Sequence, residues 1–193
     1  NEEDMLESIV DTIESCYDNV EARNLTTFDI EYLFTKLRSK SVGESTEIGV
    51  HCTYCEKVTQ IEIVLDNIEI EEVKPAPDIA LNDKFILKLK YPSYSKVREN
   101  SMHLSDRSVG NLIFHLAISS LDKLLTEEDA INLDEESLEE RIKFLDNLNG
   151  DQFKEIMEFI ENIPQLAHDV KFNCESCGKE NQQQLRGTES FFG

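Results

Sequence analysis

Hydrophobic positions recur every three to four residues over the first part of the chain, which predicts two helices. The first pattern covers residues 3–20, with apolar side chains at Met5, Leu6, Ile9, Ile13 and Tyr17. In the second pattern Thr26 can cap a helix, Asp29 occupies the capping-box position, and Leu25 and Ile30 have the spacing of a hydrophobic staple. Its apolar face comprises Ile30, Leu33, Phe34 and Leu37, and Gly43 follows its end.

From Glu44 the hydrophobic period changes to two, which is typical of strands. Alternating apolar positions lead into and out of a Cys-x-x-Cys pair, and Asp66-Asn67 is a candidate turn after them. Further alternating runs continue to Pro92, where they end. We therefore expect a small antiparallel sheet. Its apolar positions are Ile48, Val50, Thr59, Ile61, Ile63, Leu65, Ile68, Ile70, Val73, Phe85, Leu87, Leu89 and Tyr91.

After Pro92 the pattern is mainly helical. Asn149 can cap the last helix, and Pro164 closes it. Three apolar stripes comprise Val109, Leu112, Ile113, Leu116, Ala117 and Leu124; Leu138, Ile142 and Leu145; and Phe153, Ile156, Met157 and Ile160.

A strand pattern returns at Val170 and enters a second Cys-x-x-Cys pair, and residues 179–186 form a candidate partner strand. The C-terminal segment ESFFG is apolar near its end, so it either docks on the protein or contacts a partner.

Four cysteines, Cys52, Cys55, Cys174 and Cys177, form these two pairs, CTYC and CESC. Each pair lies between two strand-like segments, as in a zinc knuckle, and glycine at position 178 suits a turn with positive φ. About 120 residues separate the pairs, more than in common zinc ribbons, but an inserted subdomain can occupy this interval. We predict one structural Zn²⁺ site made by all four, because four thiolates leave no coordination position for substrate.

Other uses of these cysteines stay open. The pairs could be unrelated thiols or two disulfides, and a thioredoxin-like redox pair would need a βαβ context that neither pair has. His51 or His168 could replace one cysteine as a ligand. Cys16 lies one position from the apolar face of the first helix, and we expect a partly buried free thiol there.

These patterns together predict an α+β fold, in which a small antiparallel zinc-ribbon-like sheet carries an N-terminal helical pair. A large, mainly helical insertion lies between the two Cys-x-x-Cys pairs. The expected division is N-terminal helices (1–43), zinc-bound sheet (44–92 plus 168–187), helical subdomain (93–167) and tail (188–193).

The formal net charge of −21 disfavours nucleic acid as a partner, since phosphate binding normally uses Lys and Arg. Acidic residues concentrate over 127–140, whereas basic ones concentrate over 84–107, and this asymmetry suits docking onto proteins. No apolar run is long enough to span a membrane, and the acidic start does not resemble a signal peptide. We expect a soluble, cytosol-made protein.

Motifs for nucleotide binding, zinc proteolysis and serine hydrolysis are missing from the sequence, and seven glycines supply little material for a phosphate loop. His103 and His115 are candidate general bases, but the apolar surroundings of His115 favour a structural role. Residues 134–140 lack the order of a calcium loop and are interpreted as an acidic surface. The sequence thus predicts no enzyme and no small-molecule substrate.

The segment TTFDIEYLFTKLRSKSVGE, followed by a strand and a Cys-x-x-Cys pair, resembles the baseplate hub proteins of T-even-like tailed bacteriophages. Length, acidity and the order of sheet and helices are also similar. The matching positions are Phe28, Asp29, Glu31, Tyr32, Leu33, Phe34, Arg38, Lys40, Ser41, Val42, Gly43 and Glu44.

This resemblance implies a late viral protein that takes part in forming the central hub of a contractile tail's baseplate, in contact with other hub or tail proteins. It implies a location in the virion tail baseplate, and in the host cytoplasm during assembly. The alternative is an assembly chaperone that is absent from the mature virion. No catalytic residue carries over from the resemblance.

Overall fold

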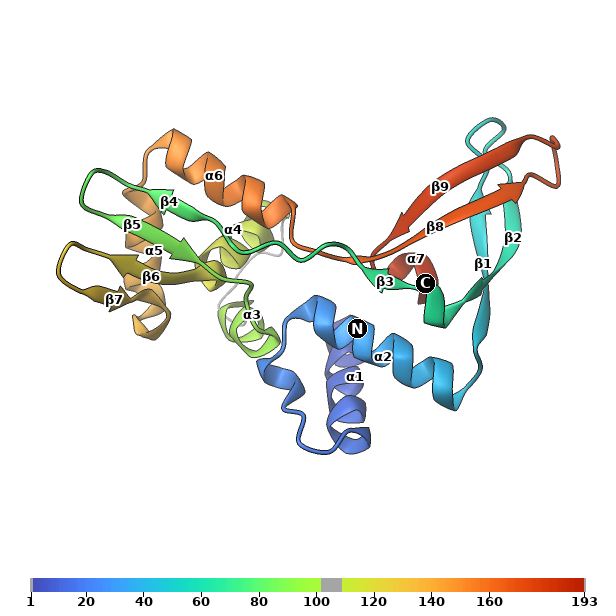
Figure 1. The fold of residues 1–193 in the computed structure, drawn as a ribbon, viewed down its shortest axis with the longest axis horizontal. Coiled ribbons are helices and arrows are strands. Elements are labelled where there is room, and N and C mark those ends of the chain that lie inside the picture. Colours follow the sequence, from blue (N-terminus) through green and yellow to red (C-terminus); the bar gives the residue numbers. More distant parts are fainter. Residues whose placement is uncertain (1, 102–108, 193) are drawn as a thin grey trace. The chain divides into compact units, whose positions relative to one another are not determined.

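The computed structural model describes residues 2–101 and 109–192 and divides into two compact units (Figure 1). Unit 1 combines both ends of the chain with a central segment, as Asn1–Ala22, Phe28–Val73 and Pro164–Gly193. Unit 2 comprises Arg23–Thr27 and Lys74–Ile163. The interval between the two cysteine pairs therefore contains most of a separate compact unit.

Unit 1 contains two antiparallel sheets and the N-terminal helices. Strands β1 and β2 form a two-stranded hairpin in which Ser45 pairs with Val64 and His51 with Val58. The second sheet has the order β3-β8-β9. The elements are α1 (Glu2–Cys16), α2 (Thr27–Ser41), β1 (Ser45–His51), β2 (Val58–Val64), the 3-10 turn η2 (Leu65–Asn67), β3 (Glu69–Ile70), β8 (Leu166–Asn173), β9 (Glu180–Arg186) and α7 (Glu189–Phe192).

An apolar cluster in unit 1 comprises inward-facing residues of both sheets and of the segments that join them. The C-terminal helix α7 completes this core, because Phe191 is only 1% exposed and packs among the strand residues. Of the two expectations for the tail, docking on the protein is therefore correct. The buried core residues are Val50, Ile63, Leu65, Ile68, Leu166, Val170, Phe172 and Phe191.

Polar contacts hold α2 against the turn that follows β2. Lys36 Nζ donates to the carbonyl oxygen of Asp66 at 2.8 Å, and Ser39 Oγ donates to its carboxylate at 2.8 Å. Lys40 pairs with the second carboxylate oxygen at 2.7 Å. Hydrogen bonds from Lys40 and Ser39 lower the pKa of Asp66, because they stabilise the ionised carboxylate.

Unit 2 places helices against a four-stranded antiparallel sheet of order β4-β5-β6-β7. Its strands are β4 (Asp78–Ala80), β5 (Ile86–Leu89), β6 (Leu121–Leu125) and β7 (Ala130–Asn132). Its helices are α3 (Tyr94–Ser101), α4 (Val109–Ser120), α5 (Leu138–Asp146) and α6 (Gly150–Glu161), with short 3-10 turns η1 (Ala22–Asn24) before α2 and η3 (Leu133–Glu135) after β7.

Local sequence signals start two of these helices. Asn149 caps α6, as predicted, because its Oδ1 accepts from the amides of Asp151 and Gln152, and the Gln152 side chain accepts from the Asn149 amide. Ser137 and Glu140 form an equivalent capping box at α5. The buried apolar core between sheet and helices comprises Ile79, Leu87, Leu89, Ala117, Ile118, Leu121, Leu133, Leu145, Ile156, Phe159 and Ile160.

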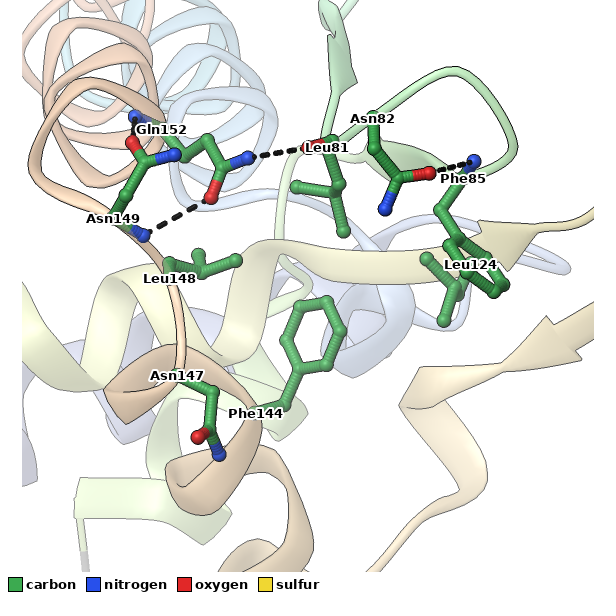
Figure 2. A pocket seen from close by; sticks show the side chains of 9 residues that line it. All are labelled: Leu81, Asn82, Phe85, Leu124, Phe144, Asn147, Leu148, Asn149 and Gln152. Atoms are coloured by element: carbon green, nitrogen blue, oxygen red, sulfur yellow. Dashed lines mark hydrogen bonds between the residues drawn. The ribbon is translucent and has the colours of Figure 1, made fainter.

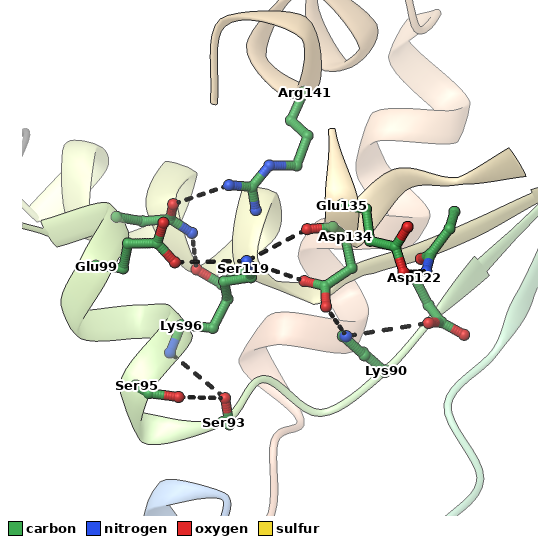
Figure 3. Close-up of polar contacts among 12 residues, drawn as sticks. Lys90, Ser93, Ser95, Lys96, Glu99, Ser119, Asp122, Asp134, Glu135 and Arg141 are labelled. Atoms are coloured by element: carbon green, nitrogen blue, oxygen red, sulfur yellow. Dashed lines mark hydrogen bonds and ion pairs between the residues drawn. The ribbon is translucent and has the colours of Figure 1, made fainter. Parts of the chain in front are cut away.

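A buried polar network joins α3, α4 and α5 (Figure 3). Arg141, which is 3% exposed, donates through Nη2 to Asn100 Oδ1 at 3.2 Å. Asn100 Nδ2 donates in turn to Ser119 Oγ at 2.7 Å. The network fixes the arrangement of three helices, because breaking it would leave buried polar atoms without partners.

A charged cluster lies close to that network in unit 2. Lys90 contacts the Asp134 carboxylate at 2.8 Å, and Lys96 contacts it at 3.5 Å. Burial raises the pKa of this carboxyl, but the two lysines outweigh burial and leave the pKa lowered. These ion pairs connect η3 to the residue that follows β5 and to α3.

The predicted α+β class, with helices and small antiparallel sheets, is confirmed. The helical stripe expected to reach Leu124 is wrong beyond Ser120, because Leu121–Leu125 forms β6. The expected single sheet is also wrong, since strands over 44–92 are distributed among three sheets. Strands β4 and β5 belong to unit 2. Among the described residues, no helix is both long and apolar enough to cross a membrane.

Candidate metal centre

The first cysteine pair occupies the turn between β1 and β2. The Cys52 amide donates to the Lys57 carbonyl oxygen at 2.9 Å, and the Glu56 amide donates to the Cys52 carbonyl oxygen at 2.9 Å. Glu56 adopts φ 60°, a left-handed conformation that is unusual for a residue with a side chain. This tight turn directs two thiols of one pair to the same side of the hairpin end.

The turn between β8 and β9 repeats this geometry at the second pair. The Cys174 amide donates to the Lys179 carbonyl oxygen at 2.9 Å, and the Gly178 amide donates to the Cys174 carbonyl oxygen at 2.8 Å. Gly178 has φ 69°, as the sequence led us to expect. Two hairpins that lie far apart in the sequence therefore end in turns of the same geometry.

The four sulfur atoms of the two turns converge in unit 1. Cys52 Sγ lies 3.7 Å from Cys177 Sγ, and Cys55 Sγ lies 3.6 Å from Cys174 Sγ. All four ligand atoms lie within 4.8 Å of one another. Among the described residues this is the one such group of three or more His, Cys, Asp or Glu ligand atoms.

These separations test the alternatives. A disulfide needs sulfur atoms about 2.0 Å apart, and all four cysteines are free thiols. A tetrahedral ion with Zn–S bonds of about 2.3 Å places its ligands about 3.8 Å apart. The Cys52–Cys177 and Cys55–Cys174 sulfur distances match that tetrahedral edge. The four donors therefore fit Zn²⁺ in number and in these two spacings.

Backbone amides support the ionised form of the first cysteine of each pair. Burial raises the pKa of Cys52, but amide donors from Tyr54 and Cys55 outweigh burial and lower that pKa to about 6. Amide donors from Cys177 and Ser176 likewise lower the pKa of Cys174. Thiolate is the form that binds metal, so the turns prepare these sulfurs as ligands.

The second cysteine of the first pair behaves differently. An amide donor from Lys57 lowers the pKa of Cys55, but burial and the neighbouring thiols outweigh it and raise the pKa to about 12. Cys55 shares the cluster with Cys52, Cys174 and Cys177, and ionising every thiol without a cation would bring like charges together. A divalent cation would remove that repulsion, which is a further reason that the cluster suits a metal.

Asn181 on β9 joins the two turns through a buried amide. Its Oδ1 accepts from the Thr53 amide at 2.9 Å and from Thr53 Oγ1 at 3.0 Å. Its Nδ2 donates to Cys52 Sγ at 3.5 Å and to the Lys179 carbonyl oxygen at 3.0 Å. Sequence reasoning missed Asn181, because nothing within the polar run ENQQQ distinguishes one amide from its neighbours.

Contacts between the turns also extend along the hairpins. Lys179 Nζ lies 4.3 Å from the centroid of the Tyr54 ring, a cation–π contact. The Glu175 amide donates to Thr59 Oγ1 at 3.3 Å. The first hairpin therefore contacts the second turn outside the sulfur cluster as well.

The histidines offered as alternative ligands have other contacts. His51 Nδ1 lies 3.1 Å from the Glu56 carbonyl oxygen, and His168 Nδ1 lies 3.1 Å from that of Asn67. Neither belongs to the sulfur group. Cys16 is exposed, so the expected partly buried thiol is wrong: α1 ends at this residue, where the helix no longer covers it.

Of the candidate general bases, His115 lies on α4 and His103 lies outside the described residues. Four cysteine ligands would saturate a tetrahedral ion, so a metal held here would crosslink two hairpins rather than activate a substrate. The arrangement is chemically suited to a structural role.

Comparisons with known proteins place the whole chain in one family. The model of one family, described as "T4 bacteriophage base plate protein", matches residues 1–193. The match thus covers both compact units and both cysteine pairs. Comparisons with curated proteins and with solved structures found no match.

Proposed function

The chain belongs to the family of T4 bacteriophage base plate proteins, and from this premise we propose that it is a non-enzymatic structural or assembly component of the baseplate's central hub. In this proposal it acts in a contractile tail and is stabilised by one structural Zn²⁺. The observation that carries the proposal is the family match over the whole chain.

The hub assignment is supported by the segment from Phe28 to Glu44, which resembles hub proteins and forms α2 with the start of the following loop. From this helix, the side chains of Ser39 and Lys40 hydrogen-bond the Asp66 carboxylate within unit 1. In this proposal the segment stabilises unit 1 itself. The partners, which are other hub or tail proteins, bind to other surfaces.

The zinc part is supported by the sulfur separations of 3.6 and 3.7 Å and by amide donors that favour thiolates. Its ligands are Cys52, Cys55, Cys174 and Cys177. The ion crosslinks two hairpins that each end in a turn. Its role is to hold unit 1 together, and the partner contacts lie on other surfaces.

Purified virions and infected-cell lysates test the role directly. Quantitative mass spectrometry of isolated baseplates should find this protein at a fixed ratio to other hub proteins, and deleting its gene should stop hub formation. Presence in lysate with absence from baseplates would instead establish the chaperone alternative. Normal tails from the deletion strain would overturn both assignments.

A metal analysis tests the zinc part separately. The purified full-length chain should contain one zinc per chain by elemental mass spectrometry. If the chain folds without zinc and its melting temperature does not change when a chelator is added, the structural-zinc proposal is overturned. The baseplate assignment is not affected by that result.

A further inference from the structure

Strand β7 forms one edge of the sheet in unit 2. It pairs with β6 through Lys123–Asn132, Leu124–Ile131 and Leu125–Ala130, and its other side carries no strand within the described part of the chain. An edge strand can bind an extended segment from another protein through its outward-facing amides and carbonyls. In β7 the Ala130 amide donates to Asp129 Oδ1 at 2.7 Å, so an incoming segment would have to replace that local bond or use the remaining backbone groups.

An apolar surface adjoins this edge. Ile131 is 44% exposed, and it lies on the same sheet face as its register partner Leu124. Leu124 also lines a pocket of about 430 Å³, together with Phe85, Phe144 and Leu148 (Figure 2). The apolar surface therefore continues from the edge strand into a hollow that could receive a side chain.

The hollow is preformed, because its polar lining residues hold its walls in place. Gln152 Nε2 donates to the Leu81 carbonyl oxygen at 2.8 Å, and Asn82 Oδ1 accepts from the Phe85 amide at 3.1 Å. These bonds fix the β4–β5 turn against the start of α6. A docked side chain would not have to order these loops first.

Charge at the edge indicates what kind of segment fits. Residues 126–136 contain six acidic residues and no basic one. Asp134 already contacts Lys90 and Lys96, but the others flank β7 on both sides. A hydrogen bond with Glu140 and repulsion from it raise the pKa of Glu136, so carboxylates crowd each other here.

We propose that β7 and the adjoining apolar surface dock an extended segment of a partner protein in which Lys or Arg residues flank an apolar anchor. The segment pairs with the β7 backbone, its basic residues meet the acidic flanks, and its anchor covers Ile131 and Leu124 at the pocket. This inference rests on the proposed function, because it names the partner surface of a baseplate component.

A fluorescent peptide of lysines alternating with valine and phenylalanine tests the site on the zinc-loaded full-length chain. Fluorescence anisotropy should show saturable binding that weakens in about 0.5 M salt, where surface charges are screened. Ile131→Asp should weaken binding by at least about tenfold, because it removes apolar contact area. Amide NMR shifts should concentrate at residues 124–132.

Leu112→Asp is the matched control, since Leu112 is 43% exposed on α4 and undergoes the same chemical change. Binding by this variant should equal that of the parent chain. The double variant Glu127→Gln, Glu128→Gln keeps the apolar surface and should weaken binding through charge alone, which guards against a folding defect in Ile131→Asp. Equal losses in both Asp variants would overturn the site, as would binding mapped to α1.

A short edge strand flanked by charges can also serve to prevent strand pairing. Absence of peptide binding would establish that protective role and overturn the docking site. This failure is distinct from failure of the proposed function. If the protein is found in baseplates but does not bind the peptide, only the docking site is overturned. If the chain binds the peptide but is absent from baseplates, only the structural role is overturned.

Discussion

The two compact units differ in what holds them together. The apolar cluster around the two small sheets of unit 1 has eight buried residues, and the hairpins of these sheets end at a four-cysteine cluster. Further buried apolar residues of unit 1 lie in α1 and α2. Unit 2 has eleven such residues packed between one sheet and its helices, and Arg141, Asn100 and Ser119 add a buried polar network. The ends of the two hairpins in unit 1 lack a continuous core between one sheet and its helices, so a crosslink at the cysteines would stabilise them most, whereas unit 2 relies on its packed core.

The sharpest test of this difference is to remove one ligand. Cys174→Ser should abolish stoichiometric zinc and unfold unit 1, since structural zinc contributes on the order of 10 kcal/mol of apparent binding free energy. Hydrogen exchange should lose protection at β8 and β9 while β5, β6 and α6 stay protected. Elemental analysis and exchange mass spectrometry measure both effects.

Cys16→Ser is the matched control for this experiment, because Cys16 is an exposed thiol outside the cluster. It should keep one zinc per chain and the parent exchange pattern. Simultaneous loss of protection in both units of Cys174→Ser would show that the units are not independent.

The converse change targets the apolar core of unit 2. Ile156 is fully buried, so Ile156→Ala should lower the free energy of unfolding of unit 2 by about 2–5 kcal/mol through lost contacts and a cavity. Zinc content should not change. Leu112→Ala, at an exposed site of the same unit, should cost less than about 0.5 kcal/mol. Release of zinc by Ile156→Ala would contradict the comparison.

A smaller effect is expected from the amide that joins the two turns. Asn181→Ala removes hydrogen bonds to Thr53 and to the Cys52 sulfur, so stability should fall by about 1–3 kcal/mol. Zinc affinity should fall about 10- to 100-fold, as measured by competition with a chromogenic chelator. Gln182→Ala, on the exposed neighbour, should match the parent. An unchanged affinity in Asn181→Ala would mean that the ligands alone position the ion.

The smallest effects distinguish the two turns from each other. Gly178→Ala should destabilise unit 1 by about 1 kcal/mol, because alanine is strained at φ 69°. Glu56→Gly relieves the same strain at φ 60° and should stabilise unit 1. The gain in stability should be smaller than about 1 kcal/mol, because glycine also increases the entropy of the unfolded chain. Thermal unfolding of the zinc-loaded chain measures both. Equal signs for the two changes would refute the equivalence of the turns.

Local patterns predicted much of this protein. The Asn149 cap, the helices over α2, α5 and α6, and the strands on either side of each cysteine pair follow from spacing of apolar and capping residues. The cysteine cluster was also predictable, because both pairs carry the knuckle spacing and Gly178 occupies a turn position with positive φ, which glycine adopts without strain. Signals of this kind act within one or two turns of chain.

Other features were missed because their causes are remote in sequence. Leu124 continues the apolar stripe of α4, but Leu121–Leu125 pairs with β5 and becomes a strand. Ile79 belongs to a three-residue strand after two prolines, too short for a pattern to reveal. Asn181 acquires its role only because Thr53 lies opposite it across the turns.

The sequence by itself determined the periodicity of each segment, the helix caps and the identity of the four cysteines that cluster. Only the tertiary structure decided which strands share a sheet, that β5 joins unit 2, and that Cys55 and Cys174 lie 3.6 Å apart although 119 residues separate them. The physical reason is that periodicity and capping are properties of neighbouring residues. Strand pairing and ligand convergence depend instead on burial between segments that meet only in the folded chain.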